Sequence, residues 1–87
     1  MGDSISRDNE GIKYIGYCDS NGTFLPRALY CIACSGRVHP YALDICSLRC
    51  TQCQKDIKIF PSEHEMMDYV SLQWKPLEKE CQARAQH

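Results

Sequence analysis

Two Cys-x-x-Cys pairs constrain this chain more than any other feature of its sequence. Cys31 and Cys34 form the first pair, Cys50 and Cys53 form the second, and 15 residues separate them. Two tight turns at this spacing can close on one tetrahedral metal ion, and the intervening residues are enough for a strand to go out and return. The spacing therefore predicts a zinc ribbon with these four cysteines as ligands.

Zinc suits four thiolates because it is borderline soft and has no geometric preference that they would violate. Four protein ligands leave no open position for a reacting water, so we expect one structural Zn²⁺. Ser35 and Gly36 supply the small residues that a metal-binding turn needs, since glycine tolerates a positive φ. Iron in an electron carrier is a more distant alternative, because the turns lack the glycine and aromatic context of rubredoxins, which they only faintly resemble.

A rival ligand set uses Cys46 in place of Cys53, in a Cys-x3-Cys unit with Cys50. This set would leave Cys53 unused in an otherwise well-formed turn, so the first set is favoured. The other cysteines, Cys18 and Cys81, are then expected to be small buried residues.

A chain of 87 residues makes one small domain whose core alone would leave it marginally stable, so some cross-link is expected. The N-terminal residues contain no apolar run of signal-peptide length, which predicts a cytoplasmic protein with reduced thiols. No stretch approaches the roughly 18 apolar residues of a membrane span, so no membrane partner is expected.

Local patterns divide the chain into three parts and predict a small α+β fold. Residues 1–10 are polar and lack periodicity, which predicts a disordered leader. Residues 11–60 are predicted to form a hairpin plus the zinc ribbon, since strand formers at 12–17 precede an Asn-Gly pair and residues 56–60 alternate. Residues 61–87 are predicted to form a C-terminal helical segment that packs on the ribbon or extends from it.

The helical segment has a clear start and an apolar stripe. Ser62 and Glu65 form a capping box, and Pro76 is expected to kink or break the helix near residues 73–75. The residue types of the stripe are frequent at protein interfaces, although such a stripe more often packs on its own domain. The residues predicted to form a partner-binding surface on this stripe are Met66, Tyr69, Val70 and Trp74.

The net charge of -1 hides a division along the chain. Residues 27–60 carry five basic residues against two acidic ones, whereas residues 1–26 carry two against four and residues 61–87 carry three against five. The basic central part could touch phosphates, although four thiolates on a divalent ion would subtract two charges from it. The basic side chains expected to share one face of the ribbon are Arg37, Arg49, Lys55 and Lys58.

The runs from Leu29 to Val38 and from Leu48 to Lys55 resemble the ribbon of Com-type translational regulators of Mu-like phages. Both have a Cys-x2-Cys, a basic and apolar turn, a similar gap, and a second turn followed by lysine and a short apolar strand. The resemblance covers residues 29–60 and implies a small regulatory ribbon. This chain differs by fewer basic residues around the second turn, an added N-terminal hairpin and an acidic C-terminal helix.

Two function classes follow. The favoured one is a protein-interaction adaptor, with the ribbon as a rigid platform and the helical stripe docked on a partner or a second copy. The alternative is a regulator that binds RNA or DNA through the basic face, with Tyr30 or Tyr41 stacked on a base. No Ser/His/acid or Cys/His context and no glycine-rich phosphate loop is present, so we expect neither catalysis nor a small-molecule substrate.

Overall fold

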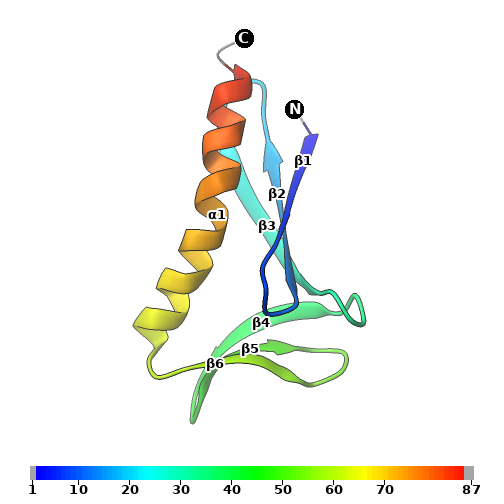
Figure 1. Cartoon of the computed structure of the whole chain (residues 1–87), viewed down its shortest axis with the longest axis vertical. Helices are drawn as coiled ribbons and strands as arrows, with labels where there is room; N and C mark the ends of the chain where they lie inside the picture. The colour runs from blue at the N-terminus through cyan, green and yellow to red at the C-terminus, as the bar shows by residue number, and fades with distance from the viewer. Residues whose placement is uncertain (1, 86–87) are drawn as a thin grey trace.

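The computed structural model describes residues 2–85, which form six β-strands and one α-helix. The strands make one antiparallel sheet in chain order, and each is hydrogen-bonded to the next. The elements are β1 (Gly2–Arg7), β2 (Ile12–Cys18), β3 (Phe24–Cys31), β4 (Arg37–Ala42), β5 (Cys46–Cys50), β6 (Asp56–Phe60) and α1 (Glu63–Ala85). Figure 1 shows the sheet curved into a half-barrel, with β1–β3 standing beside the helix and β4–β6 crossing below.

This architecture corrects the predicted fold class. One continuous six-stranded sheet replaces a small ribbon with a separate hairpin, and the two Cys-x-x-Cys turns are connections within that sheet. Residues 2–7 form the edge strand β1 and not a disordered leader, because β2 pairs with it from Gly2 to Arg7. A polar segment can be ordered when a neighbouring strand satisfies its backbone groups.

Strand β2 shows which face of the sheet is covered. Ile12, Tyr14 and Cys18 are buried, whereas the residues between them are half-buried, except for the buried Gly16. Successive side chains of a strand point to opposite faces, so one face of the sheet packs in the core and the other meets solvent. We call the face covered by α1 the inner face and the opposite one the outer face. The neighbouring strands contribute Leu29, Val38, Leu48, Cys50 and Phe60 to the inner face.

Helix α1 begins at the predicted cap and runs through Pro76 without the predicted break. The N–H of Glu65 donates to Ser62 Oγ at 3.2 Å. The carbonyl that Pro76 leaves without a helical partner belongs to Leu72, which is on the exposed side where water can bond to it. Among the described residues, no helix is both long enough and apolar enough to cross a membrane.

The apolar stripe of α1 is part of the core. Met66 is 1% exposed and Trp74 is 8% exposed, and Tyr69 and Val70 pack against the same cluster. In the folded molecule Met66 and Trp74 are therefore not accessible to a partner, whereas Tyr69 and Val70 are half-buried, and the partner-binding surface stays a prediction. The stripe closes the inner face of the sheet.

Trp74 is the centre of an aromatic contact between α1 and the sheet. Its ring meets Tyr14 edge-on at a centroid distance of 5.4 Å and lies 5.8 Å from Phe24. Gly16 makes this arrangement possible, because a Cβ at that position would collide with the Phe24 ring. A residue with a side chain at position 16 would thus displace the Phe24 ring on which Trp74 packs.

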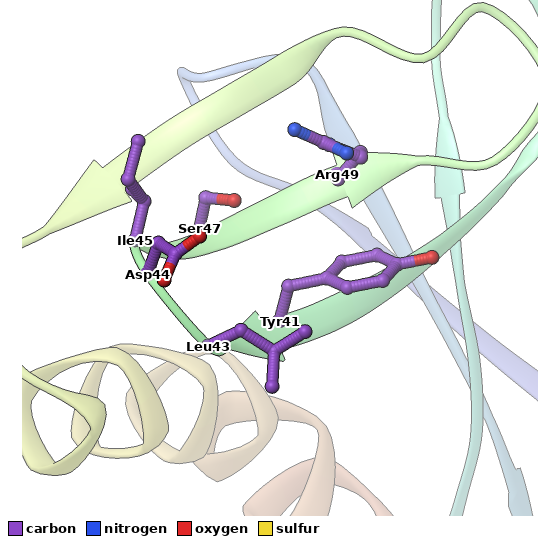
Figure 2. A pocket seen from close by; sticks show the side chains of 6 residues that line it. All are labelled: Tyr41, Leu43, Asp44, Ile45, Ser47 and Arg49. Carbon is purple, nitrogen blue, oxygen red and sulfur yellow. The ribbon is translucent and has the colours of Figure 1, made fainter.

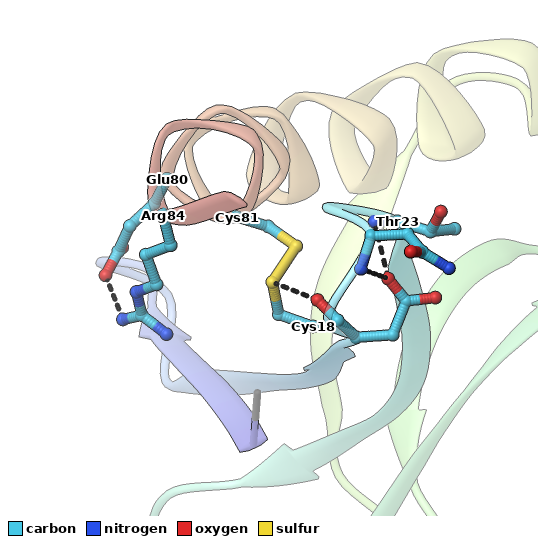
Figure 3. The surroundings of a disulfide bond; sticks show 7 residues. Cys18, Thr23, Glu80, Cys81 and Arg84 are labelled. Atoms are coloured by element: carbon cyan, nitrogen blue, oxygen red, sulfur yellow. Dashed lines mark hydrogen bonds and ion pairs between the residues drawn. A yellow bond between two sulfur atoms is a disulfide. The ribbon is translucent and has the colours of Figure 1, made fainter. Parts of the chain in front are cut away.

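A disulfide between Cys18 and Cys81 joins the end of β2 to the last part of α1. Figure 3 shows the bond between the helix and the sheet, with Glu80 and Arg84 paired beside it on α1. Both cysteines are buried, as expected, but they are bonded to each other and are not the reduced thiols that the sequence predicted. They are 63 residues apart, and only the tertiary fold brings them together.

A carboxylate ties the β1–β2 turn to the rest of the molecule. Asp8 accepts hydrogen bonds from the N–H groups of Glu10 and Ile12 at 2.9 Å and from the hydroxyls of Tyr14 and Tyr69 at 2.7 Å. Burial raises the pKa of Asp8, but the hydrogen bonds outweigh burial, so its pKa lies below the usual 3.8. The turn is thereby held to both the sheet and α1.

Asp8→Asn is expected to lower the free energy of unfolding at pH 7 by about 2 kcal/mol, because charge-assisted hydrogen bonds are lost. The native pKa is lower than that of the unfolded chain, so this stabilisation is present above pH about 4 and disappears as pH falls through the native pKa. Urea denaturation at pH 7 and pH 3 measures it. Asp19→Asn is the control, since Asp19 accepts the N–H groups of Asn21 and Thr23 in a similar turn. Equal losses in both variants would contradict the role of the tyrosines.

Candidate metal centre

The two Cys-x-x-Cys turns lie side by side because of the strand order. Cys31 ends β3 and Cys34 lies in the connection to β4, whereas Cys50 ends β5 and Cys53 lies in the connection to β6. Strands β4 and β5 pair with each other, with Val38 opposite Cys50, and this register brings the two connections together. The ligand atoms of the four cysteines all lie within 4.8 Å of one another.

The two turns share one backbone design. In each turn the first cysteine donates its N–H to the carbonyl five residues later, at 2.8 Å in the first turn and 3.0 Å in the second. The residue after the second cysteine has a positive φ in both turns, 64° at Ser35 and 57° at Gln54. Two copies of one turn thus present four sulfurs to a common point.

Gly36 supports the site because it has no side chain. A Cβ there would lie 2.8 Å from Cys50 Sγ and 3.2 Å from Cys34 Sγ, closer than ordinary contacts allow. The sequence predicted glycine in this turn for a positive φ, but Ser35 takes that conformation instead. The glycine is needed for the close approach of backbone and sulfur.

The sulfur positions fit a tetrahedral ion. Zinc–sulfur bonds of about 2.3 Å place sulfurs about 3.8 Å apart, inside the 4.8 Å span of this cluster. The sulfurs of Cys34 and Cys50 lie 3.3 Å apart. Cys31 and Cys50 are buried whereas Cys53 is exposed, so one side of the site rests on the core and the other meets solvent.

The backbone favours a thiolate at this site. The N–H of Cys53, 3.5 Å from Cys50 Sγ, lowers the pKa of Cys50 to about 6. The hydrogen bond with Cys50 raises the pKa of Cys34 to about 12. One sulfur is therefore ionised near neutral pH, and a bound cation would supply the charge that ionises the others.

The rival ligand set is not the one that the fold assembles. Cys46 lies at the other end of β5 from Cys50, opposite Ala42 on β4 and Phe60 on β6. Within residues 2–85, the cluster that could hold a metal ion contains Cys53 and not Cys46.

The four basic residues predicted to share one face of the ribbon do not do so. Arg37 and Arg49 lie on the outer face, where Arg49 is held 2.9 Å from Asp56. Lys58 lies on the inner side, with its Nζ 3.6 Å from a carboxylate oxygen of Glu10. Lys55 borders a small apolar cavity beside the second metal-binding turn.

The fold instead builds a basic row that was not predicted from the sequence. Arg7, Lys13, Tyr30 and Arg37 are successive cross-strand partners on β1 to β4, and directly opposed residues share a face. The Tyr30 ring lies between two cations, at 5.9 Å from Lys13 Nζ and 5.8 Å from Arg37 Cζ. The sequence carried no local sign of this row, because its register depends on β1 being a strand.

Two more cation–tyrosine pairs lie on the outer face. Arg27 is 5.1 Å from the ring of Tyr17, and Arg49 is 5.5 Å from the ring of Tyr41. Asp56 neutralises Arg49, and the pKa of Asp56 is lowered by Arg49 and by Ser47. The exposed acidic residues of α1 lie on the other side of the molecule, so the charges of the fold are segregated.

A shallow pocket of about 220 Å³ lies on the β4–β5 hairpin. Figure 2 shows Tyr41, Ser47 and Arg49 on the strands, and the other lining residues at the end of the hairpin. The pocket is smaller than most ligand sites, and the Ser47 hydroxyl at its edge donates to Asp56 at 2.9 Å. The lining residues are Tyr41, Leu43, Asp44, Ile45, Ser47 and Arg49.

The arrangement combines four convergent sulfurs with a basic, tyrosine-bearing outer face. The sulfurs can hold a metal ion, and four protein ligands would leave that ion no position for substrate. Comparisons with protein-family models, curated proteins and solved structures find no match to this chain, and so lend no support to the resemblance to Com-type regulators.

Proposed function

We propose that this protein is a non-enzymatic binding module in which a structural zinc ion stabilises the sheet and the outer face binds single-stranded nucleic acid. The observation that carries the proposal is the cross-strand row of Arg7, Lys13, Tyr30 and Arg37. Cations in a row can follow a phosphate backbone, and tyrosines beside them offer π-faces to bases. Zinc is the ion that a four-thiolate structural site favours.

The shape of the outer face favours a single strand over a duplex. Recognition in the major groove needs a helix or a two-stranded ribbon that can enter the groove. The one helix of residues 2–85 lies on the inner face, and the outer face is a broad sheet with half-buried Tyr17 and Tyr30. Sheet faces that carry aromatic side chains are typical of modules that stack unpaired bases.

Charge segregation supports the same assignment. The outer face presents Arg7, Lys13, Arg27 and Arg37 against the exposed Asp3, whereas α1 carries an excess of acidic residues. A polyanion approaching the molecule would therefore be attracted to the outer face and repelled by α1. The adaptor function predicted from the sequence uses the ribbon and the stripe of α1, and two residues of that stripe, Met66 and Trp74, are buried in the core.

A double variant tests the basic row. Lys13→Gln with Arg37→Gln is expected to weaken binding of fluorescein-labelled 15-mers of dT and rU. If both contacts are to phosphate, the slope of log affinity against log salt should fall by about 1.4, at about 0.7 per contact. Fluorescence anisotropy at several salt concentrations measures both effects.

The matched control removes two positive charges from α1. Lys75 and Lys79 are exposed on the helix, and Lys75→Gln with Lys79→Gln changes the net charge by the same amount. This control should leave the salt slope unchanged. An equal loss in both double variants, or no binding of either oligonucleotide at low salt, would refute the proposal.

A further inference from the structure

The two edges of the sheet differ in how they are protected against pairing with another strand. Open edges present unpaired N–H and C=O groups, and proteins commonly guard them with free charges. Edge strand β1 carries Asp3 and Arg7, which are exposed and form no ion pair within residues 2–85. Edge strand β6 also carries two charged residues, but neither is free.

The charges of β6 are engaged within the molecule. Asp56 accepts hydrogen bonds from Arg49 and Ser47, both at 2.9 Å. Lys58 is turned toward Glu10, and its Nζ lies 5.3 Å from the centroid of the Tyr69 ring. Ile59 is 59% exposed. The edge of β6 thus offers backbone groups and an apolar side chain without a free charge to discourage pairing.

A groove of about 360 Å³ runs between β6 and the first half of α1. Its apolar lining includes Ile59 and Leu72, and Leu72 is 56% exposed. Glu65 and Asp68 stand on the helix side of the groove and are exposed, and Asp68 also lies 3.3 Å from His64. An occupant of the groove therefore meets apolar surface and a negatively charged wall.

We propose that the edge of β6 accepts an extended segment of a partner protein as a seventh strand, with alternating apolar and basic side chains. Backbone hydrogen bonds to β6 would supply affinity, and alternate side chains would supply specificity. Alternate side chains point to opposite faces, so the apolar ones would lie beside Ile59 on the outer face, and the basic ones would lie on the helix side and face Glu65 and Asp68. This surface is separate from the outer-face row and does not depend on the nucleic-acid proposal.

A second copy of this chain fits the edge less well than a basic segment. An isologous pairing of two β6 strands centred on Lys58 would place that lysine opposite its own copy. It would also bring two acidic helix starts, each with Glu65 and Asp68, to the same edge. Charge complementarity therefore selects a partner segment with positive side chains.

The test uses the whole chain and the peptide acetyl-Lys-Val-Lys-Val-Lys-Val-amide. Two control peptides accompany it: one has glutamate in place of each lysine, and the other is the Lys-Val peptide methylated on alternate backbone nitrogens. The Lys-Val peptide is expected to slow hydrogen exchange of backbone amides at 56–60 and not at 2–7. The other two peptides should give no protection. Equal protection by the Glu-Val peptide, or protection of β1, would overturn the assignment.

Two isoleucines give matched edge variants. Ile59→Lys adds a charge to β6 and should weaken Lys-Val peptide binding about tenfold or more, whereas Ile5→Lys on β1, where Ile5 is 50% exposed, should not. Glu65→Gln with Asp68→Asn leaves the sheet untouched and should remove the preference for the Lys-Val peptide. Unchanged binding in both the Ile59→Lys and the Glu65→Gln, Asp68→Asn variants would refute the proposal. A concentration-dependent dimer would also refute it if Ile59→Lys dissociates that dimer and the peptide does not displace it.

Discussion

Cys50→Ser is expected to abolish stoichiometric metal binding and leave the chain largely unfolded at 25 °C. Cys50 is fully buried at the end of β5, and its sulfur accepts the N–H of Cys53. The binding free energy of a structural zinc site is on the order of 10 kcal/mol, comparable to the whole stability of a typical domain. Native mass spectrometry would show the lost ion, and circular dichroism the lost strand signal. Treating the unaltered protein with a strong chelator should have the same effect.

Cys46→Ser is the matched control for this prediction, because Cys46 lies on the same strand and outside the sulfur cluster. This variant should keep one metal ion per chain and a cooperative unfolding transition. The opposite pattern, in which Cys46→Ser loses the ion and Cys53→Ser keeps it, would restore the rival ligand set. A Cys50→Ser protein that unfolds as cooperatively as the unaltered one would refute a structural role for the metal.

Trp74→Ala is expected to lower the free energy of unfolding by about 3–5 kcal/mol, the cost of emptying a large buried aromatic site. The ring is 8% exposed and lies between α1 and the sheet, against Tyr14 and Phe24. A Trp74 ring that served a partner would instead be exposed, and its loss would cost little stability. Denaturant unfolding followed by circular dichroism measures the change, since the only tryptophan is removed.

Met67→Ala provides the comparison on the same helix. Met67 is 46% exposed and lies outside the core cluster, so its replacement should change the free energy of unfolding by no more than about 0.5 kcal/mol. Similar losses in the two variants would mean that burial of the Trp74 ring contributes nothing specific.

Features encoded by adjacent residues could be predicted from the sequence. The cysteine spacing indicated the ligand cluster, and Ser62 with Glu65 indicated the start of α1. The alternation at residues 56–60 indicated β6. Each of these signals lies within one turn or one strand, so a local pattern is enough to recognise it.

Features that depend on distant partners could not be predicted. Strand β1 is polar and is ordered by its pairing with β2 and by the contact of Asp8 with Tyr69, 61 residues away. The spacing of the apolar stripe on α1 is the same whether the stripe packs on its own sheet or on a partner. Only the curved sheet, which lies against the stripe, distinguishes the two. The partner of Cys18 is equally invisible, because the pairing of cysteines cannot be read from their spacing.

The disulfide and the metal-binding turns each connect the part of the chain before residues 43–45 to the part after them. The end of the β4–β5 hairpin is its most accessible point, with Leu43 89% exposed. A proteolytic nick at residues 43–45 would give one fragment with Cys18, Cys31 and Cys34, and another with Cys50, Cys53 and Cys81. Each fragment holds half of the covalent link and half of the ligand set. With the ion bound, the severed halves would stay joined until both a reductant and a chelator were present.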